Sequence, residues 1–220
     1  SYPSGGRHQV LLWRDGKAHK VPLDGSDPGL NDINTAGVAV GGTFRSGPGG
    51  GEESIRQTPV AYLASGSLVT LAGATDGSAY AINEAGTIVG ESARRPVRWA
   101  SPQSVAEELP LPSGASGGAA RDIDEDGTIV GYVTLGSRDD RPYVWFADGT
   151  HRELPAPVAG GGQAVARQGF FRAYGVRNGW VTGIIGLADP RAVRWNLRTG
   201  EATVFPEFLS RASMANTHGW

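Results

Sequence analysis

The sequence contains no cysteine, which excludes disulfide bonds, thiolate catalysis and cysteine-based zinc sites. It also lacks any apolar run approaching the roughly 18 residues that mark a membrane-spanning helix, so no membrane insertion is expected. Neither sign of charge dominates: 20 basic and 22 acidic residues leave a net charge of −2. The strongly basic surface typical of nucleic-acid binding is therefore missing, and no nucleic-acid partner is expected.

Glycine and proline are abundant instead, with 34 and 14 residues among 220. Both residues disfavour helix interiors and favour turns, so long helices are not expected. A hydrophobic fraction of 39% and six tryptophans nevertheless predict a packed core rather than a disordered chain. The composition predicts one all-β domain over residues 1–220, built from short strands joined by many turns.

Two patterns repeat along the chain. The first, Ala-Tyr-Ala-Ile-Asn-Glu-Ala-Gly-Thr-Ile-Val-Gly at 79–90, recurs at 30–41 and 120–131, in a shorter form at 174–183, and begins again at 214–220. The second is a short apolar strand that ends in an aromatic residue. It ends at Trp13, Tyr62, Trp99, Trp145 and Trp195.

Each repeat unit therefore contains four expected strands: an aromatic strand, a strand with a Leu or Val, an Ile-Asn strand and an Ile-Val-Gly strand. Four short strands at intervals of about 40 to 50 residues are typical of β-propeller blades. We expect a five-bladed β-propeller of four-stranded antiparallel blades with adjacent termini, and with the aromatic wedged between neighbouring blades. The expected blades cover 7–44, 58–92, 95–134, 141–186 and 191–220, the last closed by residues 1–6.

The combined pattern Ala-x-x-Ile-Asn-x-x-Gly-x-Ile-Val-Gly followed by a Trp resembles the HAF-type extracellular repeats of bacteria. The resemblance spans nearly the whole chain, although the fourth and fifth copies depart from it at Val176-Arg177 and Met214-Ala215. It implies a secreted, β-propeller-like protein. It implies no particular activity, because fold and function separate in such families.

Loop length predicts which face binds a partner. Two of the four connections in each unit are short turns on one face. The other two carry the insertions, at 45–58, 112–118, 134–141 and 155–172. Long loops on a rigid scaffold often carry function, so we expect the site on this elaborated face.

Arginines recur there. Arg95, Arg141 and Arg191 each stand four residues before an aromatic, where the innermost strand is expected to begin, and Arg56 lies near the equivalent place. Together they would form a ring of guanidinium groups for a carboxylate-bearing partner, and Arg138 is a further candidate for partner binding. The alternative is that these arginines only pack over loops and pair with nearby acids such as Asp139, Asp140 and Asp189.

The longest loop ends in Phe170, Phe171 and Arg172. The two aromatics are either a plug over the blade or an exposed anchor for a partner, and Arg172 is a further candidate for partner binding.

Metal and catalytic signatures are weak. Asp122, Asp124 and Asp126 match the start of a calcium-binding loop, but Val133 stands where the bidentate glutamate would be needed. They remain a weak alternative to the expectation of no metal and no cofactor. Glycoside hydrolysis needs two facing carboxylates, and arginines occupy the strand ends where these would be expected.

We therefore expect a secreted, non-enzymatic interaction or adaptor module, with a subunit of a secreted bacterial toxin assembly as one setting. Its partner is another secreted protein with an acidic or carboxylate-bearing segment. A carbohydrate-binding lectin is the main alternative, and a glycan-cleaving propeller enzyme is the second.

Overall fold

A computed structural model describes residues 9–14, 16–23, 26–46, 55–136, 139–157, 171–186 and 190–205. The part of the chain that it describes is all-β, as predicted, with every strand pairing antiparallel to its neighbour. In that part there is no helix long and apolar enough to cross a membrane.

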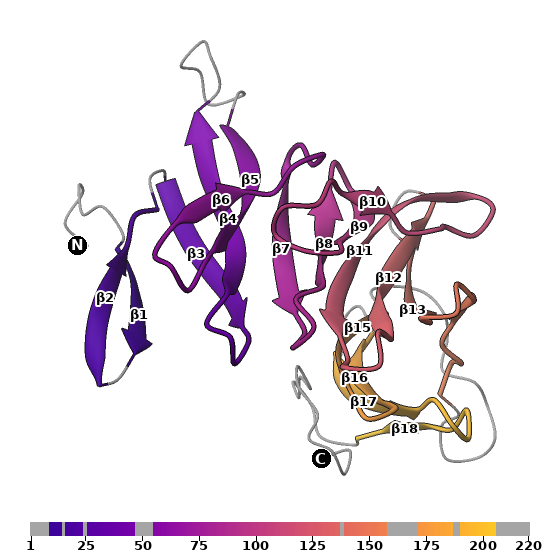
Figure 1. Cartoon of the computed structure of the whole chain (residues 1–220). Helices are drawn as coiled ribbons and strands as arrows, with labels where there is room; N and C mark the ends of the chain where they lie inside the picture. The colour runs from indigo at the N-terminus through magenta and orange to yellow at the C-terminus, as the bar shows by residue number, and fades with distance from the viewer. Residues whose placement is uncertain are drawn as a thin grey trace, which may run out of the picture.

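The described strands form one two-stranded hairpin and four four-stranded sheets, which follow one another along an arc (Figure 1). The hairpin comprises β1 (Val10–Arg14) and β2 (Lys17–Val21). The first sheet comprises β3 (Ser26–Ile33), β4 (Ala39–Ser46), β5 (Ile55–Tyr62) and β6 (Leu68–Thr70). The second comprises β7 (Gly77–Ile82), β8 (Ile88–Ser92), β9 (Arg95–Trp99) and β10 (Glu107–Glu108). The third comprises β11 (Ala115–Ile123), β12 (Ile129–Leu135), β13 (Asp139–Trp145) and β14 (His151–Glu153). The fourth comprises β15 (Arg172–Arg177), β16 (Trp180–Ile185), β17 (Arg191–Asn196) and β18 (Ala202–Val204).

Hydrogen bonding groups these strands differently from the expected units 7–44, 58–92, 95–134, 141–186 and 191–220. Each four-stranded sheet begins with the Ile-Asn strand and continues through the Ile-Val-Gly strand, the aromatic strand and the short Leu strand. The reason is visible in the register, because Gly41 on β4 pairs with Val60 on β5, so these two strands belong to one sheet. The aromatic strand is therefore third in its sheet and not the innermost strand.

The first strand of each sheet packs against the preceding sheet. Strand β7 contacts β3, β4 and β5; β11 contacts β7, β8 and β9; and β15 contacts β11, β12 and β13. The first strands thus also contact one another in succession, which brings them together along the inner side of the arc.

Every first strand carries a β-bulge at the same motif position. The register shifts once between Leu30 and Asp32, and again at the equivalent places around Tyr80, Arg121 and Tyr174. The last glycine of the motif stands opposite the bulge. A Cβ on Gly41 would lie 2.0 Å from the Gly29 carbonyl oxygen, closer than any real Cβ contact. The glycine is therefore needed because the bulged backbone approaches it too closely for a side chain.

The hydrophobic core is divided into clusters between consecutive sheets. Val40 and Leu71 of the first sheet, for example, pack with Ile88 and Trp99 of the second. Corresponding clusters join the second sheet to the third and the third to the fourth. A smaller one joins Val21 and Leu23 to the first sheet.

The aromatic residues fill these inter-sheet spaces, which confirms the role predicted for them. Trp99, Trp145 and Trp195 are nearly fully buried. Each indole N–H donates to a carbonyl of the preceding sheet's last segment: Trp99 to Ala72 at 2.9 Å, Trp145 to Pro110 at 2.7 Å and Trp195 to Pro155 at 2.8 Å. The bonds satisfy a polar group that would otherwise be costly to bury.

Candidate functional site

Arg95, Arg141 and Arg191, which were expected where the innermost strands begin, lie instead on the third strands of their sheets. Arg95 begins β9 and Arg141 lies within β13, and both pair with local carboxylates. Arg95 Nε lies 3.2 Å from Glu108, and Arg141 Nη2 lies 2.5 Å from Asp139. Arg191 begins the third strand β17. Arg95 and Arg141 thus pair with neighbouring acids, as the alternative interpretation states.

The other candidate residues fall into two groups. Phe171 is buried at 2% exposure in the cluster between the third and fourth sheets, so it serves as a plug and not as an exposed anchor. Arg138 and Phe170 lie outside the described residues, as does the side chain of Arg56. Arg172 is described, and it lies close to a different site.

That site is the row of side chains at the four bulges, Asn31, Tyr80, Arg121 and Tyr174, which we call the bulge row. Contacts between consecutive sheets connect its members. Asn31 Nδ2 donates to the Ala79 carbonyl at 2.7 Å. The Arg121 guanidinium lies over the Tyr80 ring, 3.9 Å from its centroid, and 5.6 Å from the centroid of the Tyr174 ring. One arginine is therefore held between two tyrosines contributed by the sheets on either side of it.

Arg121 makes no hydrogen bond or ion pair with another described residue, and its Nε is buried without a partner among them. This is unusual, because buried polar nitrogens are nearly always paired. Stacking on tyrosine faces stabilises the cation but leaves the donors in the guanidinium plane unused.

Glu91 and Tyr132 follow the motif glycines on β8 and β12 and lie beside the bulge row. The Tyr80 hydroxyl donates to Glu91 Oε2 at 3.4 Å. Burial raises the pKa of Glu91, although Tyr80 and the nearby Arg121 oppose the shift. Burial, reinforced by the Glu91 charge, also raises the pKa of Tyr80 to about 12. Tyr80 therefore stays a neutral donor, and Glu91 carries its negative charge less readily than an ordinary glutamate.

Arg172 stands next to this group, but its charge is already compensated. Its Nε donates to Asp140 Oδ2 at 2.6 Å, and its guanidinium lies 4.3 Å from the centroid of the Tyr132 ring. Asp140 is held in turn by the Thr134 hydroxyl, 2.8 Å from its other oxygen. Arg172 thus positions Tyr132 and Asp140, whereas Arg121 keeps its donors unused by the described residues.

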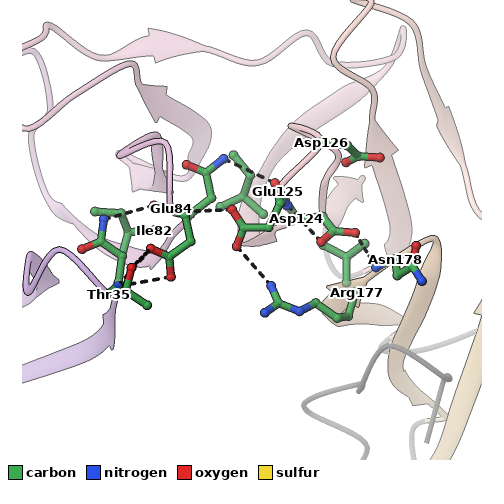
Figure 2. Close-up of polar contacts among 12 residues, drawn as sticks. Thr35, Ile82, Glu84, Asp124, Glu125, Asp126, Arg177 and Asn178 are labelled. Carbon is green, nitrogen blue, oxygen red and sulfur yellow. Dashed lines mark hydrogen bonds and ion pairs between the residues drawn. The ribbon is translucent and has the colours of Figure 1, made fainter.

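The turns that follow the first strands are joined by a second set of polar contacts, shown in Figure 2. The Glu84 carboxylate accepts from Thr35, the Glu84 amide donates to Glu125 Oε2 at 2.9 Å, and Glu125 Oε1 lies 3.2 Å from Arg177 Nη1. Asn34 and Asn83 each donate to a carbonyl of the following sheet, at 3.2 and 3.3 Å. We call this set the turn belt, and it joins all four sheets at the turns after their first strands.

The calcium alternative is not supported by this geometry. The carboxylates of Asp122, Asp124 and Asp126 accept hydrogen bonds from backbone amides of their own turn or of the fourth sheet. Figure 2 shows Asp126 apart from the Asp124 carboxylate. Within the described ranges, no group of three acidic or histidine side chains could hold a metal ion. These aspartates therefore stabilise turns and join sheets.

Sequence reasoning missed Tyr80, Arg121 and Tyr174 because they occupy a variable position of the motif. A bulge cannot be recognised from alternation alone, since it breaks the alternation. The available signal was the motif glycine, which marks where an opposing strand comes close. No protein-family model matches the chain, and no curated protein matches it either.

Proposed function

We propose that this protein is a non-enzymatic binding module that recognises a carboxylate of an acidic partner protein through Arg121. The observation that carries the proposal is the guanidinium of Arg121, stacked on Tyr80 and making no hydrogen bond with the described residues. Arginine presents its donors in a rigid fork that matches the two oxygens of a carboxylate. The two tyrosines hold that fork in one orientation, which lowers the entropy lost when a ligand binds.

The charge around Arg121 favours an anion. Arg172 is neutralised by Asp140, and burial favours the uncharged form of Glu91. Arg121 therefore contributes a positive charge that nearby described groups compensate only in part. A ligand carboxylate would complete the site.

A protein partner is favoured over a glycan for two reasons. A guanidinium already covers one face of the Tyr80 ring and one face of the Tyr132 ring, which reduces the aromatic surface open to sugar stacking. The bulge row also varies, with Asn31, Tyr80, Arg121 and Tyr174 in successive sheets, whereas a lectin of this repeat type would carry the same residue in each. One asymmetric ligand fits this arrangement better than several equal sugar sites.

The test uses a fluorescent hexaglutamate peptide, titrated at low salt and followed by fluorescence anisotropy. Arg121→Gln removes the charge but keeps a long polar side chain. We expect about tenfold weaker binding, because a charged hydrogen bond contributes about 1.5 kcal/mol or more and about 1.4 kcal/mol corresponds to a factor of ten. Circular dichroism verifies that the variant is folded.

Arg95→Gln is the matched control, because Arg95 is an arginine in a neighbouring strand that is already paired with Glu108. It should leave the affinity for hexaglutamate nearly unchanged. Equal losses in both variants, or equal binding of hexaglutamine, would contradict the proposal. Saturable binding on a glycan array that Arg121→Gln abolishes would replace it with the lectin alternative.

We infer in addition that the four sheets and the hairpin are blades of a five-bladed β-propeller. In support of this, the sheets share one strand order and one inter-sheet packing pattern, and the hairpin supplies the two strands of a further unit. The first-strand motif begins once more at 214–220, which lies outside the described residues. Secretion, and a place in a secreted bacterial assembly, stay proposals that rest on the resemblance to HAF-type repeats.

A further inference from the structure

The hairpin of β1 and β2 corresponds to the third and fourth strands of a sheet. Trp13 pairs with Ala18 across the hairpin, as Tyr62 pairs with Leu68 and Trp195 with Ala202. Trp13 therefore occupies the position of the buried aromatics, and Leu11 the position two residues earlier on the same face.

Exposure separates the hairpin from its counterparts. Trp13 is 71% exposed and Leu11 is 50% exposed, whereas Trp99 and Val97 at the equivalent positions are 0% and 2% exposed. We call the surface of Leu11 and Trp13 the hairpin face. Two adjacent large apolar side chains that are exposed in one unit and buried in the others indicate a surface that another element covers.

The other sheets show what covers such a face. Leu71, Leu109 and Leu154 each follow a fourth strand, and each donates its amide to a proline carbonyl of its own sheet. The residue after each leucine then offers its carbonyl to the tryptophan of the next sheet. The covering element is therefore the end of the preceding sheet's fourth strand.

In the fourth sheet Phe205 takes the position of these leucines. Its amide donates to the Ala192 carbonyl at 3.0 Å, as the Leu154 amide donates to Pro142 at 2.8 Å. The sequence continues with Pro206, just as Leu109 and Leu154 are followed by Pro110 and Pro155. In sequence, Phe205 and the proline after it thus correspond to the large apolar residue and proline that follow the fourth strands of the second and third sheets.

We propose that the hairpin face docks on the Phe205 end of the fourth sheet of the same chain, so that Trp13 packs on Phe205. Figure 1 shows the hairpin and the fourth sheet at opposite ends of the arc. Closing this gap continues an interface that the chain already repeats between its consecutive four-stranded sheets. The contact removes two large apolar side chains from water, which favours closure.

The test is hydroxyl-radical footprinting of the wild-type chain with mass spectrometry, because it reports the exposure of each tryptophan separately. Trp13 should be protected to the same extent as Trp99 and Trp145, relative to the chain unfolded in denaturant. Oxidation of Trp13 at the unfolded rate, beside protected Trp99 and Trp145, would overturn the proposal.

A variant then identifies the covering element. Phe205→Asp should expose Trp13 to oxidation while Trp99 stays protected, and Val105→Asp, at an exposed apolar residue in another loop, should not. Protection of Trp13 that appears only at high protein concentration, together with larger species in light scattering, would show that a second copy covers the face and would also overturn the proposal. Hexaglutamate binding is measured separately, so failure of closure and failure of the Arg121 site are distinguishable.

Discussion

At the scale of single residues, aspartate carboxylates join neighbouring sheets by accepting hydrogen bonds from backbone amides. Asp32 Oδ2 accepts the Ile82 amide and Asp122 Oδ2 accepts the Val176 amide, at 2.8 and 2.7 Å. Both bonds join consecutive sheets at the same motif position. Burial raises the pKa of Asp122 to about 7, against the opposing effect of the amides of Val176 and Ile123.

This shift predicts how stability depends on pH. Because the pKa of Asp122 is higher in the folded protein than in the unfolded chain, the folded state binds its proton more tightly. The contribution of Asp122 to the free energy of unfolding therefore increases as the pH falls from about 8 through 7 toward 4, by about 1.4 kcal/mol for each unit between the two pKa values. Urea unfolding at pH 8 and pH 5 measures this.

Asp122→Asn separates this residue from other acids, since Asn does not titrate. The wild type should gain more stability on acidification than the variant does, although burial raises the pKa of Asp32 and Glu91 too. Identical gains in the two proteins would show that Asp122 titrates normally.

The motif glycines make a second prediction at this scale. In Gly41→Ala the new Cβ would meet the Gly29 carbonyl oxygen, so the backbone must shift. We expect a loss of about 3 kcal/mol in the free energy of unfolding, at the upper end of the range for overpacked sites. Gly29→Ala is the control on the facing strand, because a Cβ there has nothing within 4 Å. Equal effects of the two substitutions would contradict the close approach.

At the scale of elements, the aromatic strand joins one sheet to the preceding one. Trp99→Phe keeps an aromatic ring but removes the indole N–H that donates to Ala72 and leaves unfilled space in the core. We expect a loss of about 2 to 3 kcal/mol in the free energy of unfolding, from the unsatisfied carbonyl and the cavity together. Thermal and urea unfolding measure it.

Trp180→Phe serves as the control, since Trp180 is only partly buried and packs against Arg194 rather than between sheets. If Trp180→Phe loses as much stability as Trp99→Phe, the loss at Trp99 cannot be assigned to its burial between sheets and its bond to Ala72.

The strands also show which features of the fold could be predicted from the sequence. Hydrophobic alternation, turn glycines and the two repeats were enough to predict short antiparallel strands, all-β structure and aromatics between sheets. They could not show that the Ile-Asn strand begins each sheet, because strand order within a repeat looks the same from any starting strand. Deciding it requires the pairing of Gly41 with Val60, which is a long-range contact.

The candidate site was harder to predict, for a physical reason. Regularly spaced residues such as Arg95 and Arg141 are visible in the sequence, but an arginine with an acid nearby is satisfied locally. Arg121 is a candidate because it has no hydrogen-bond partner among the described residues and because its guanidinium lies against tyrosine rings from two other sheets. Neither property leaves a pattern in the sequence around position 121.

At the scale of the whole molecule, the sheets repeat one architecture but carry different chemistry on the inner side of the arc. The inter-sheet clusters and the indole bonds repeat, whereas the bulge row changes from Asn31 to Tyr80, Arg121 and Tyr174. Stability is distributed over equivalent interfaces, and the proposed binding site draws its side chains from the second, third and fourth sheets. Substitutions in the bulge row should therefore change binding more than folding.

The repeated indole bond has a consequence for how such a chain can change during evolution. Because the second and third sheets each offer a leucine and a carbonyl to the sheet that follows, and each receive the same elements from the sheet that precedes, their outer contacts are interchangeable. Recombination that duplicates or exchanges one of these units would preserve both of its interfaces while placing a new side chain at the bulge. The architecture thus allows the side chains along the inner side of the arc to diversify one unit at a time.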